Sequence, residues 1–204
     1  MSTNAASHVL DLAKRYRNCD GDYIVGIDLS GNPEVDATHL LPVLRQAKYD
    51  RFKLSLHVSE VAENGIQTLK LLELQPERIG HATCLLKHSD VEPFKLMTSV
   101  IDSSIPIEIC LSSNVVCRTV ESYEAHHMEF WRKKNHPIVL CTDDKGIFLT
   151  CLSREFTIAQ NTFQLSNKQL CELSFNALQY SFASEYLKND LNSKWKNFWS
   201  KNPD

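Results

Sequence analysis

The sequence predicts an α/β protein built from repeated strand–helix units on a parallel sheet. Five short apolar runs, each with the length of a strand, follow one another between residues 23 and 142. Segments with helical spacing separate the first four runs, and neighbouring runs are roughly 25–31 residues apart, near the length of one strand plus one returning helix. Such repeats are typical of an open doubly wound sheet or of part of a closed eight-stranded barrel, and periodicity does not distinguish the two.

The position of each element follows from this pattern. The strands are expected at residues 23–29, 52–58, 78–83, 105–111 and 137–142. Three crossover helices are expected where apolar residues recur every three or four positions: Leu40, Leu41, Leu44 and Ala47; Ile66, Leu69 and Leu72; Phe94, Met97 and Ile101.

After residue 142 the pattern becomes helical. Residues 148–163 have helical spacing, Ser166 and Gln169 have the spacing of a capping box, and residues 170–183 continue with apolar spacing. A last helix is expected over residues 185–199, with an apolar face that would pack on the body of the protein: Leu187, Leu191, Trp195 and Phe198. Because no linker, low-complexity tract or repeat divides the sequence, residues 1–204 are expected to form one domain.

Composition excludes several classes of function. With 22 Lys and Arg against 25 Asp and Glu, the formal net charge is −3, so no basic surplus favours a nucleic-acid partner. No apolar window is long enough to cross a membrane and the first residues do not resemble a secretory signal, so a cytoplasmic protein is expected. The seven cysteines are an odd number without a C-x-x-C pair, which indicates reduced thiols.

Polar and ionisable residues follow nearly every expected strand. The strands end in Asp28-Leu29-Ser30-Gly31, His57-Val58-Ser59-Glu60, Gly80-His81, the segment 108–114, and Thr142-Asp143-Asp144. Because the carboxyl ends of parallel strands form one shared mouth where ligands bind, we expect these groups to line one pocket.

Each candidate residue has a structural alternative. His57 and Glu60 form an H-x-x-E pair that is often merely structural or solvated. His81 could be a buried imidazole bonded to a neighbouring carbonyl. Asp143 and Asp144 place two like charges together, which favours a cation or a substrate donor, but Asp144 could instead cap a helix beginning near Gly146.

Five motifs in order carry a resemblance to a known family. They are Gly26-Ile27-Asp28-Leu29-Ser30-Gly31, Leu56-His57-Val58-Ser59-Glu60, Arg78-Ile79-Gly80-His81, Glu108-Ile109-Cys110-Leu111-Ser112-Ser113-Asn114 and Cys141-Thr142-Asp143-Asp144-Lys145-Gly146. With them the sequence resembles the adenosine deaminase family, in its adenosine deaminase-like branch of N6-methyl-AMP deaminases. Ser59 and Lys145-Gly146 favour that branch, since nucleoside deaminases typically show Ala-Gly-Glu and Asp-Asp-Pro there.

The resemblance implies an eight-stranded (β/α) barrel, or TIM barrel, with one catalytic zinc at its carboxyl mouth. It implies that His57 and Asp143 are zinc ligands, that Glu60 protonates purine N1 and that His81 orients and deprotonates water. Gly31 and Asp144 would contact the purine. The implied reaction is hydrolytic deamination of a 6-aminopurine nucleotide, N6-methyl-AMP to IMP and methylamine, with an adenosine deaminase acting on the nucleoside as an alternative. Lys145 and the segment 112–114 are candidates for holding the 5′-phosphate.

One departure from the family pattern concerns the metal. The family's first strand supplies two further zinc ligands as H-x-H, and this sequence contains no H-x-H. We therefore expect a partial barrel, about the last five βα units with additional C-terminal helices, in a truncated chain with weak zinc binding and doubtful catalysis. The expected partner is a small-molecule purine nucleotide, and the complete family form would be a monomer. A non-catalytic isoform that keeps a nucleotide- or partner-binding half barrel is the alternative.

Overall fold

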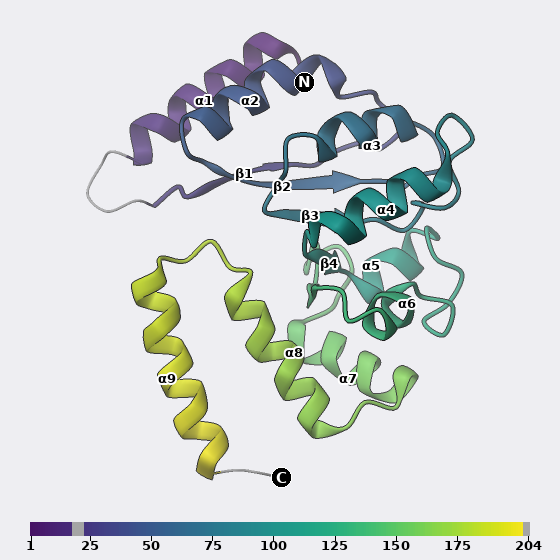
Figure 1. Ribbon diagram of the computed structural model, residues 1–204, viewed down its shortest axis with the longest axis vertical. Coiled ribbons are helices and arrows are strands. Elements are labelled where there is room, and N and C mark those ends of the chain that lie inside the picture. The colour runs from purple at the N-terminus through teal and green to yellow at the C-terminus, as the bar shows by residue number, and fades with distance from the viewer. Residues whose placement is uncertain (18–22, 202–204) are drawn as a thin grey trace. The chain divides into compact units, whose positions relative to one another are not determined.

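The computed structural model describes residues 1–17 and 23–201, and Figure 1 shows their helices and strands. The chain forms two compact units, Met1–Ile105 and Pro106–Asp204. Every strand pairs in parallel with a neighbour of its own unit, which confirms the predicted α/β class with parallel strands. In the part of the chain described, no helix is both long and apolar enough to cross a membrane.

The first unit contains three parallel strands in the order β1-β2-β3. Helices α2 and α3 pack on β2, α1 packs on α2, and α4 packs on α3. The elements in chain order are α1 (Thr3–Arg17), β1 (Gly26–Leu29), the short 3-10 helix η1 (Thr38–Leu40), α2 (Leu41–Tyr49), β2 (Lys53–Val58), α3 (Gly65–Leu72), β3 (Arg78–His81) and α4 (Pro93–Ser103).

Strand β2 lies at the centre of the first unit's core. Leu54 and Leu56 are fully buried, and the neighbouring Ser55 is also buried, so both faces of this strand are covered. A strand buried on both faces is typical of a parallel sheet covered by helices, and β2 is buried in this way although its sequence alternates polar and apolar residues. Leu44 and Ala47 of α2 add to this core, as the helical spacing predicts.

Helix α1 is an element that the sequence analysis did not identify. Its last residue, Arg17, donates to the backbone oxygens of Asp50 and Arg51, and its guanidinium lies 4.4 Å from the centre of the Phe52 ring. Leu10 and Ala13 are the buried positions of α1. These contacts attach the helix to the turn that leads into β2.

The second unit contains two parallel strands and five helices in its described residues. Its elements are β4 (Ile107–Ile109), α5 (Leu111–Val116), α6 (Met128–Lys133), β5 (Ile138–Leu140), α7 (Leu152–Phe163), α8 (Asn167–Gln179) and α9 (Glu185–Lys201). Helices α6, α7 and α8 contact β5, α5 contacts α7, and α9 packs against α8.

The strands and the three crossover helices are where the sequence predicts them, but several boundaries differ. β1 begins only at Gly26, which pairs with Lys53 at the start of β2. β4 ends at Ile109, because Leu111 already begins α5. The helix expected from residue 148 begins at Leu152, since Leu149 has a left-handed φ of 47° and keeps the preceding segment in a turn.

The C-terminal helices confirm one prediction in full and another in part. Ser166 and Gln169 form the predicted capping box at the start of α8. Helix α9 packs against α8 as expected, but its apolar face is only partly covered, with Leu187 44% and Phe198 63% exposed. Within that face, Trp195 contacts α8, with the centre of its ring 4.4 Å from that of Phe175.

Candidate active site

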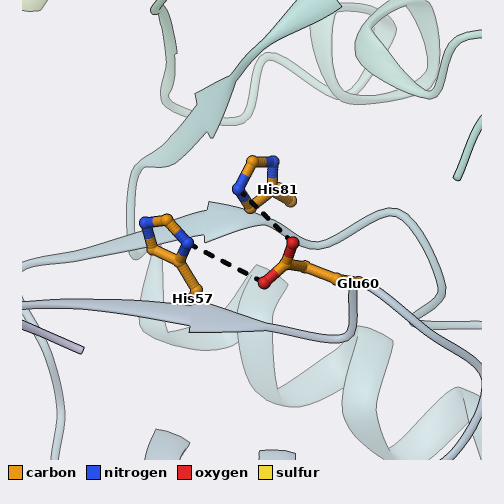
Figure 2. A group of neighbouring side chains, drawn as sticks. All are labelled: His57, Glu60 and His81. Carbon is orange, nitrogen blue, oxygen red and sulfur yellow. Dashed lines mark ion pairs between the residues drawn. The ribbon is translucent and has the colours of Figure 1, made fainter. Parts of the chain in front are cut away.

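His57, Glu60 and His81 lie together at the carboxyl ends of β2 and β3, as Figure 2 shows. His57 Nδ1 is 3.8 Å from Glu60 Oε1, and His81 Nε2 is 3.7 Å from Glu60 Oε2. The two imidazole rings meet edge to face, with centres 4.8 Å apart and planes at 80°. The carboxylate therefore lies between two imidazoles, at the sheet edge where the sequence predicts a site.

The register of the two strands places these rings. His57 pairs with Gly80, and Val58 pairs with His81, so the two histidines are one step apart on adjacent parallel strands. A Cβ at Gly80 would lie 2.7 Å from Cδ2 of His57, closer than real Cβ contacts. The missing side chain at Gly80 is thus what lets the His57 ring lie across β3.

The backbone has left-handed conformations at the ends of β2 and β3, next to the residues of the cluster. Ser59 has a φ of 51°, His81 of 59° and Ala82 of 54°, all in the left-handed region that is costly for residues other than glycine. Such conformations persist only where surrounding contacts hold them, and they are frequent at functional sites. His81 is also buried, so its ring is fixed by both backbone and packing.

Asp28 on β1 is a residue that the sequence analysis expected to line the pocket but to which it gave no chemical role. Its Oδ1 is 3.7 Å from Nε2 of His57, so a carboxylate lies near each of the two nitrogens of that ring. The signal was present in the sequence, because Asp28 ends the first strand in the same way that His57 ends the second.

A cavity of about 360 Å³ opens beside this cluster in the first unit. Asp28, Gly31, His57 and Glu60 line its polar side, and apolar residues of α1 and α2, among them Leu10, line the rest. This combination of an apolar wall with a few polar groups is typical of small-molecule sites. Gly31 has a φ of 139° and open space where a Cβ would be, so its backbone is accessible.

Asp143 and Asp144 follow β5 in the second unit. Asp143 has a left-handed φ of 54°, and its Oδ2 accepts a hydrogen bond of 2.7 Å from Ser113 Oγ. Asp144 is exposed, and its backbone oxygen accepts from the amides of Ile147 and Phe148 in a turn. The alternative that Asp144 caps a helix near Gly146 is therefore wrong, because α7 begins later and follows Cys151.

Glu155, which the sequence analysis did not select, organises the segment beside Asp143. This fully buried carboxylate accepts from the amide and hydroxyl of Ser112 and from the hydroxyl of Thr150. It thereby fixes the residue next to Ser113, which is the hydrogen-bond donor to Asp143. Of the side chains proposed to hold a phosphate, Ser112 and Ser113 are thus already engaged with protein carboxylates.

The cysteines in the described residues are free thiols, as predicted, while Cys19 lies outside the described residues. Cys110 is buried at the end of β4, and its pKa is raised, first by its hydrogen bond with Cys141 and then by desolvation. The partly buried Cys151 has a lowered pKa, because the Ser153 hydroxyl and backbone amides stabilise the thiolate.

The donor set of the first unit fits a transition metal. One ligand atom each from His57, Glu60 and His81 lies within 4.8 Å of the other two. Imidazole nitrogens and carboxylate oxygens are the donors that zinc takes besides thiolates. These three side chains could therefore hold a metal ion, although the family resemblance makes only His57 a ligand and gives Glu60 and His81 to proton transfer.

Comparison with known proteins identifies the family. The adenosine deaminase family model matches residues 1–197. N6-methyl-AMP deaminases of Danio rerio and Bos taurus are 44% and 41% identical to the chain over 93% and 95% of its length, in each case over 55% of the relative. A crystal structure of Arabidopsis ADAL complexed with IMP is 34% identical, with a TM-score of 0.86 over 97% of this chain and 55% of that one. The chain spans about half the length of the curated relatives it matches, and it belongs to the adenosine deaminase family.

Proposed function

We propose that this chain carries the deamination machinery of an enzyme that hydrolyses 6-aminopurine nucleotides, with N6-methyl-AMP as substrate and IMP and methylamine as products. The observation that carries the proposal is the cluster of His57, Glu60 and His81 on a cavity large enough for a small ligand. Support for the substrate comes from the curated relatives, which are N6-methyl-AMP deaminases, and from the IMP bound to the Arabidopsis protein.

The residues divide the proton transfers between them. Glu60, as a protonated carboxyl group, donates its proton to purine N1, which makes C6 electrophilic. His81 orients the attacking water and accepts its proton, so that the oxygen bonds to C6. The C6–N bond then breaks, methylamine leaves with the proton that His81 took from the water, the C6 hydroxyl proton returns to Glu60, and the purine keeps the oxygen as IMP. Oε2 of Glu60 is 3.7 Å from Nε2 of His81, so the proposed acid and base are close enough to act on the same purine ring.

Zinc is the proposed cofactor, with His57 and Asp143 as ligands by resemblance to the family. A bound zinc ion lowers the pKa of water to about 7 and thereby supplies a hydroxide nucleophile at neutral pH. Asp28, near the same His57 ring, would keep that imidazole oriented. Gly31, whose backbone faces the cavity, and the exposed Asp144 are the proposed purine contacts.

A variant pair tests this function. Glu60→Gln keeps the shape of the side chain but removes the acid, so methylamine release from N6-methyl-AMP should fall by about 10²-fold or more. Glu73→Gln, an exposed change at the end of α3, is the matched control and should keep the wild-type rate. Equal turnover by the Glu60→Gln variant and the wild-type chain would refute the assignment of the proton donor.

A second candidate, nucleotide binding without turnover, has its own observation. The sequence lacks the H-x-H that supplies two zinc ligands in the family. Calorimetry with IMP, together with metal analysis after dialysis, separates the two functions. IMP binding without zinc and without methylamine release supports the second candidate, whereas one zinc per chain with turnover supports the first.

A further inference from the structure

We propose that His88 is a positioning residue that holds the loop carrying Glu60. The inference deepens the proposed function and rests on it, because it is Glu60's role as proton donor that makes the loop's position matter. His88 lies in the segment after β3, and Glu60 lies in the loop after β2. The sequence analysis gave His88 no part in the site.

His88 forms hydrogen bonds on both sides of Glu60. Its Nδ1 is 2.9 Å from the backbone oxygen of Ala62, and its Nε2 is 2.9 Å from the hydroxyl of Ser59. A carbonyl oxygen only accepts, so Nδ1 carries the hydrogen, and in the neutral ring Nε2 accepts from Ser59. One imidazole thus bridges the residue before Glu60 and a residue two positions after it.

The hydrogen bonds of His88 are buried, which makes their loss costly. The side chain of His88 has no exposed surface, and Ser59 and Thr68 are also buried. The Ser59 hydroxyl is 3.1 Å from that of Thr68 in α3, which continues the chain of hydrogen bonds. In such an environment water cannot replace a lost partner, so removing the imidazole leaves buried polar groups unsatisfied.

The hydrogen bonds of His88 lie next to a strained part of the backbone at Ser59. Ser59 has a left-handed φ of 51°, a conformation that neighbouring contacts must hold. Hydrogen bonds from the segment after β3 reinforce it: the amide of Cys84 donates to the oxygen of Ser59 over 2.7 Å, and the Thr83 hydroxyl lies 3.3 Å from the oxygens of Ser59 and Glu60. The loop after β3 therefore clamps the loop after β2.

The His88 ring is packed against the start of α3. A Cβ at Gly65, the first residue of α3, would lie 2.8 Å from Cγ of His88, so the helix start packs directly on the ring. Asp90 accepts from the amides of Gly65 and Ile66 and thereby ties the His88 segment to the same helix end. The imidazole thus connects the start of α3, by packing, with the loop carrying Glu60, by hydrogen bonds.

The test uses variants that break one bond at a time. His88→Asn keeps a donor near the position of Nδ1 but loses the bond to Ser59, and Ser59→Ala loses the same bond from the other side. Each should lower kcat for N6-methyl-AMP by about 10- to 100-fold while KM changes little, because a misplaced acid affects the chemical step. The double variant should show no further loss. His8→Asn, at an exposed histidine of α1, is the matched control.

Hydrogen exchange provides a readout that does not depend on turnover. Amides of residues 59–64 should exchange about tenfold faster or more in His88→Asn and Ser59→Ala, and at the wild-type rate in His8→Asn. A lower melting temperature with unchanged exchange of these amides would overturn the proposal and make His88 a packing residue. If the wild-type chain releases no methylamine, the proposed function fails, whereas the exchange rates still decide whether His88 holds the loop.

Discussion

Gly80 is the position at which a single methyl group should displace the His57 ring. A Cβ there would lie 2.7 Å from Cδ2, 3.1 Å from Cγ and 3.2 Å from Nε2 of His57. The shortest of these distances is roughly 0.8 Å below the 3.5 Å at which carbon atoms ordinarily touch. The φ of Gly80 is outside the left-handed region, so alanine meets no backbone strain, and the contact with His57 is the cost.

The expected change in the free energy of unfolding has two parts. Overpacking of this kind costs about 1–3 kcal/mol. Replacing glycine by alanine at a compatible φ returns about 0.4–1 kcal/mol by restricting the unfolded chain. Gly80→Ala should therefore destabilise the wild-type chain, but it should stabilise a His57→Ala background by about 0.4–1 kcal/mol, because the ring that it meets is absent there.

Urea unfolding of the wild type, the two single variants and the double variant measures this coupling. Chelator in the buffer restricts the comparison to packing in the metal-free protein. The coupling energy between the two positions should be about 1–3 kcal/mol, in the direction of a double variant more stable than the sum of the single changes predicts. Additive effects would refute the reasoning that Gly80 exists to accommodate His57.

Three further predictions concern Asp90, Glu155 and a pair of cysteines. The pKa of Asp90 is lowered mainly by the Ile66 amide, so its stabilisation is present at neutral pH and is lost as the pH falls through that lowered pKa; Asp90→Asn should reduce the melting temperature at about pH 7 and not at about pH 2. Glu155→Gln should lower the free energy of unfolding by about 1–3 kcal/mol in urea, because an amide cannot accept from all three donors, while exposed Glu172→Gln should have no effect. In a brief iodoacetamide pulse followed by mass spectrometry, Cys151 should be alkylated and Cys110 should stay protected until the protein unfolds, because their pKa values are shifted in opposite directions and Cys110 is buried.

The fold class was predictable because strands and helices of a parallel α/β protein have different spacings of apolar residues, and these alternate along the sequence. In β2 the apolar residues Leu54, Leu56 and Val58 recur at every second position, and in α2 they recur three and four residues apart. The boundaries were less predictable, because they depend on backbone angles and partners. Leu149 belongs to an apolar segment, yet its left-handed φ keeps it out of α7. Nothing in the spacing of apolar residues distinguishes such a turn from the first turn of a helix.

Part of the candidate site was predictable for the same reason, since residues that end adjacent parallel strands must lie at one edge. His57 and His81 come together through the register of β2 and β3, with Glu60 in the loop between. His88 and Glu155 could not be recognised, because each acts through hydrogen bonds to residues far away in the sequence, and such partners follow only from the fold. For this reason the direct ligands and acids of a site are easier to predict than the groups that hold them.

Ser59 shows how stability and positioning separate at this site. Nucleoside deaminases, by the resemblance noted for the H-x-x-E loop, typically have glycine where this chain has Ser59, and a φ of 51° suits glycine better than serine. Serine at this conformation costs about 1–2 kcal/mol. In return it offers a hydroxyl to His88 and Thr68, which glycine does not. Serine at this position therefore has a less favourable backbone conformation than glycine, but its hydroxyl makes hydrogen bonds that hold the loop carrying Glu60.

The variants Ser59→Gly and Ser59→Ala separate the two effects. Both lose the hydroxyl, so both should lower kcat and accelerate exchange of residues 59–64 to the same extent. Glycine relieves the left-handed strain but adds freedom to the unfolded chain, at about 0.4–1 kcal/mol, so Ser59→Gly should be more stable in urea than Ser59→Ala by about 0.5–1 kcal/mol. A glycine variant that kept the wild-type kcat and exchange rates would show that the turn alone positions Glu60, and that the serine hydroxyl and His88 do not.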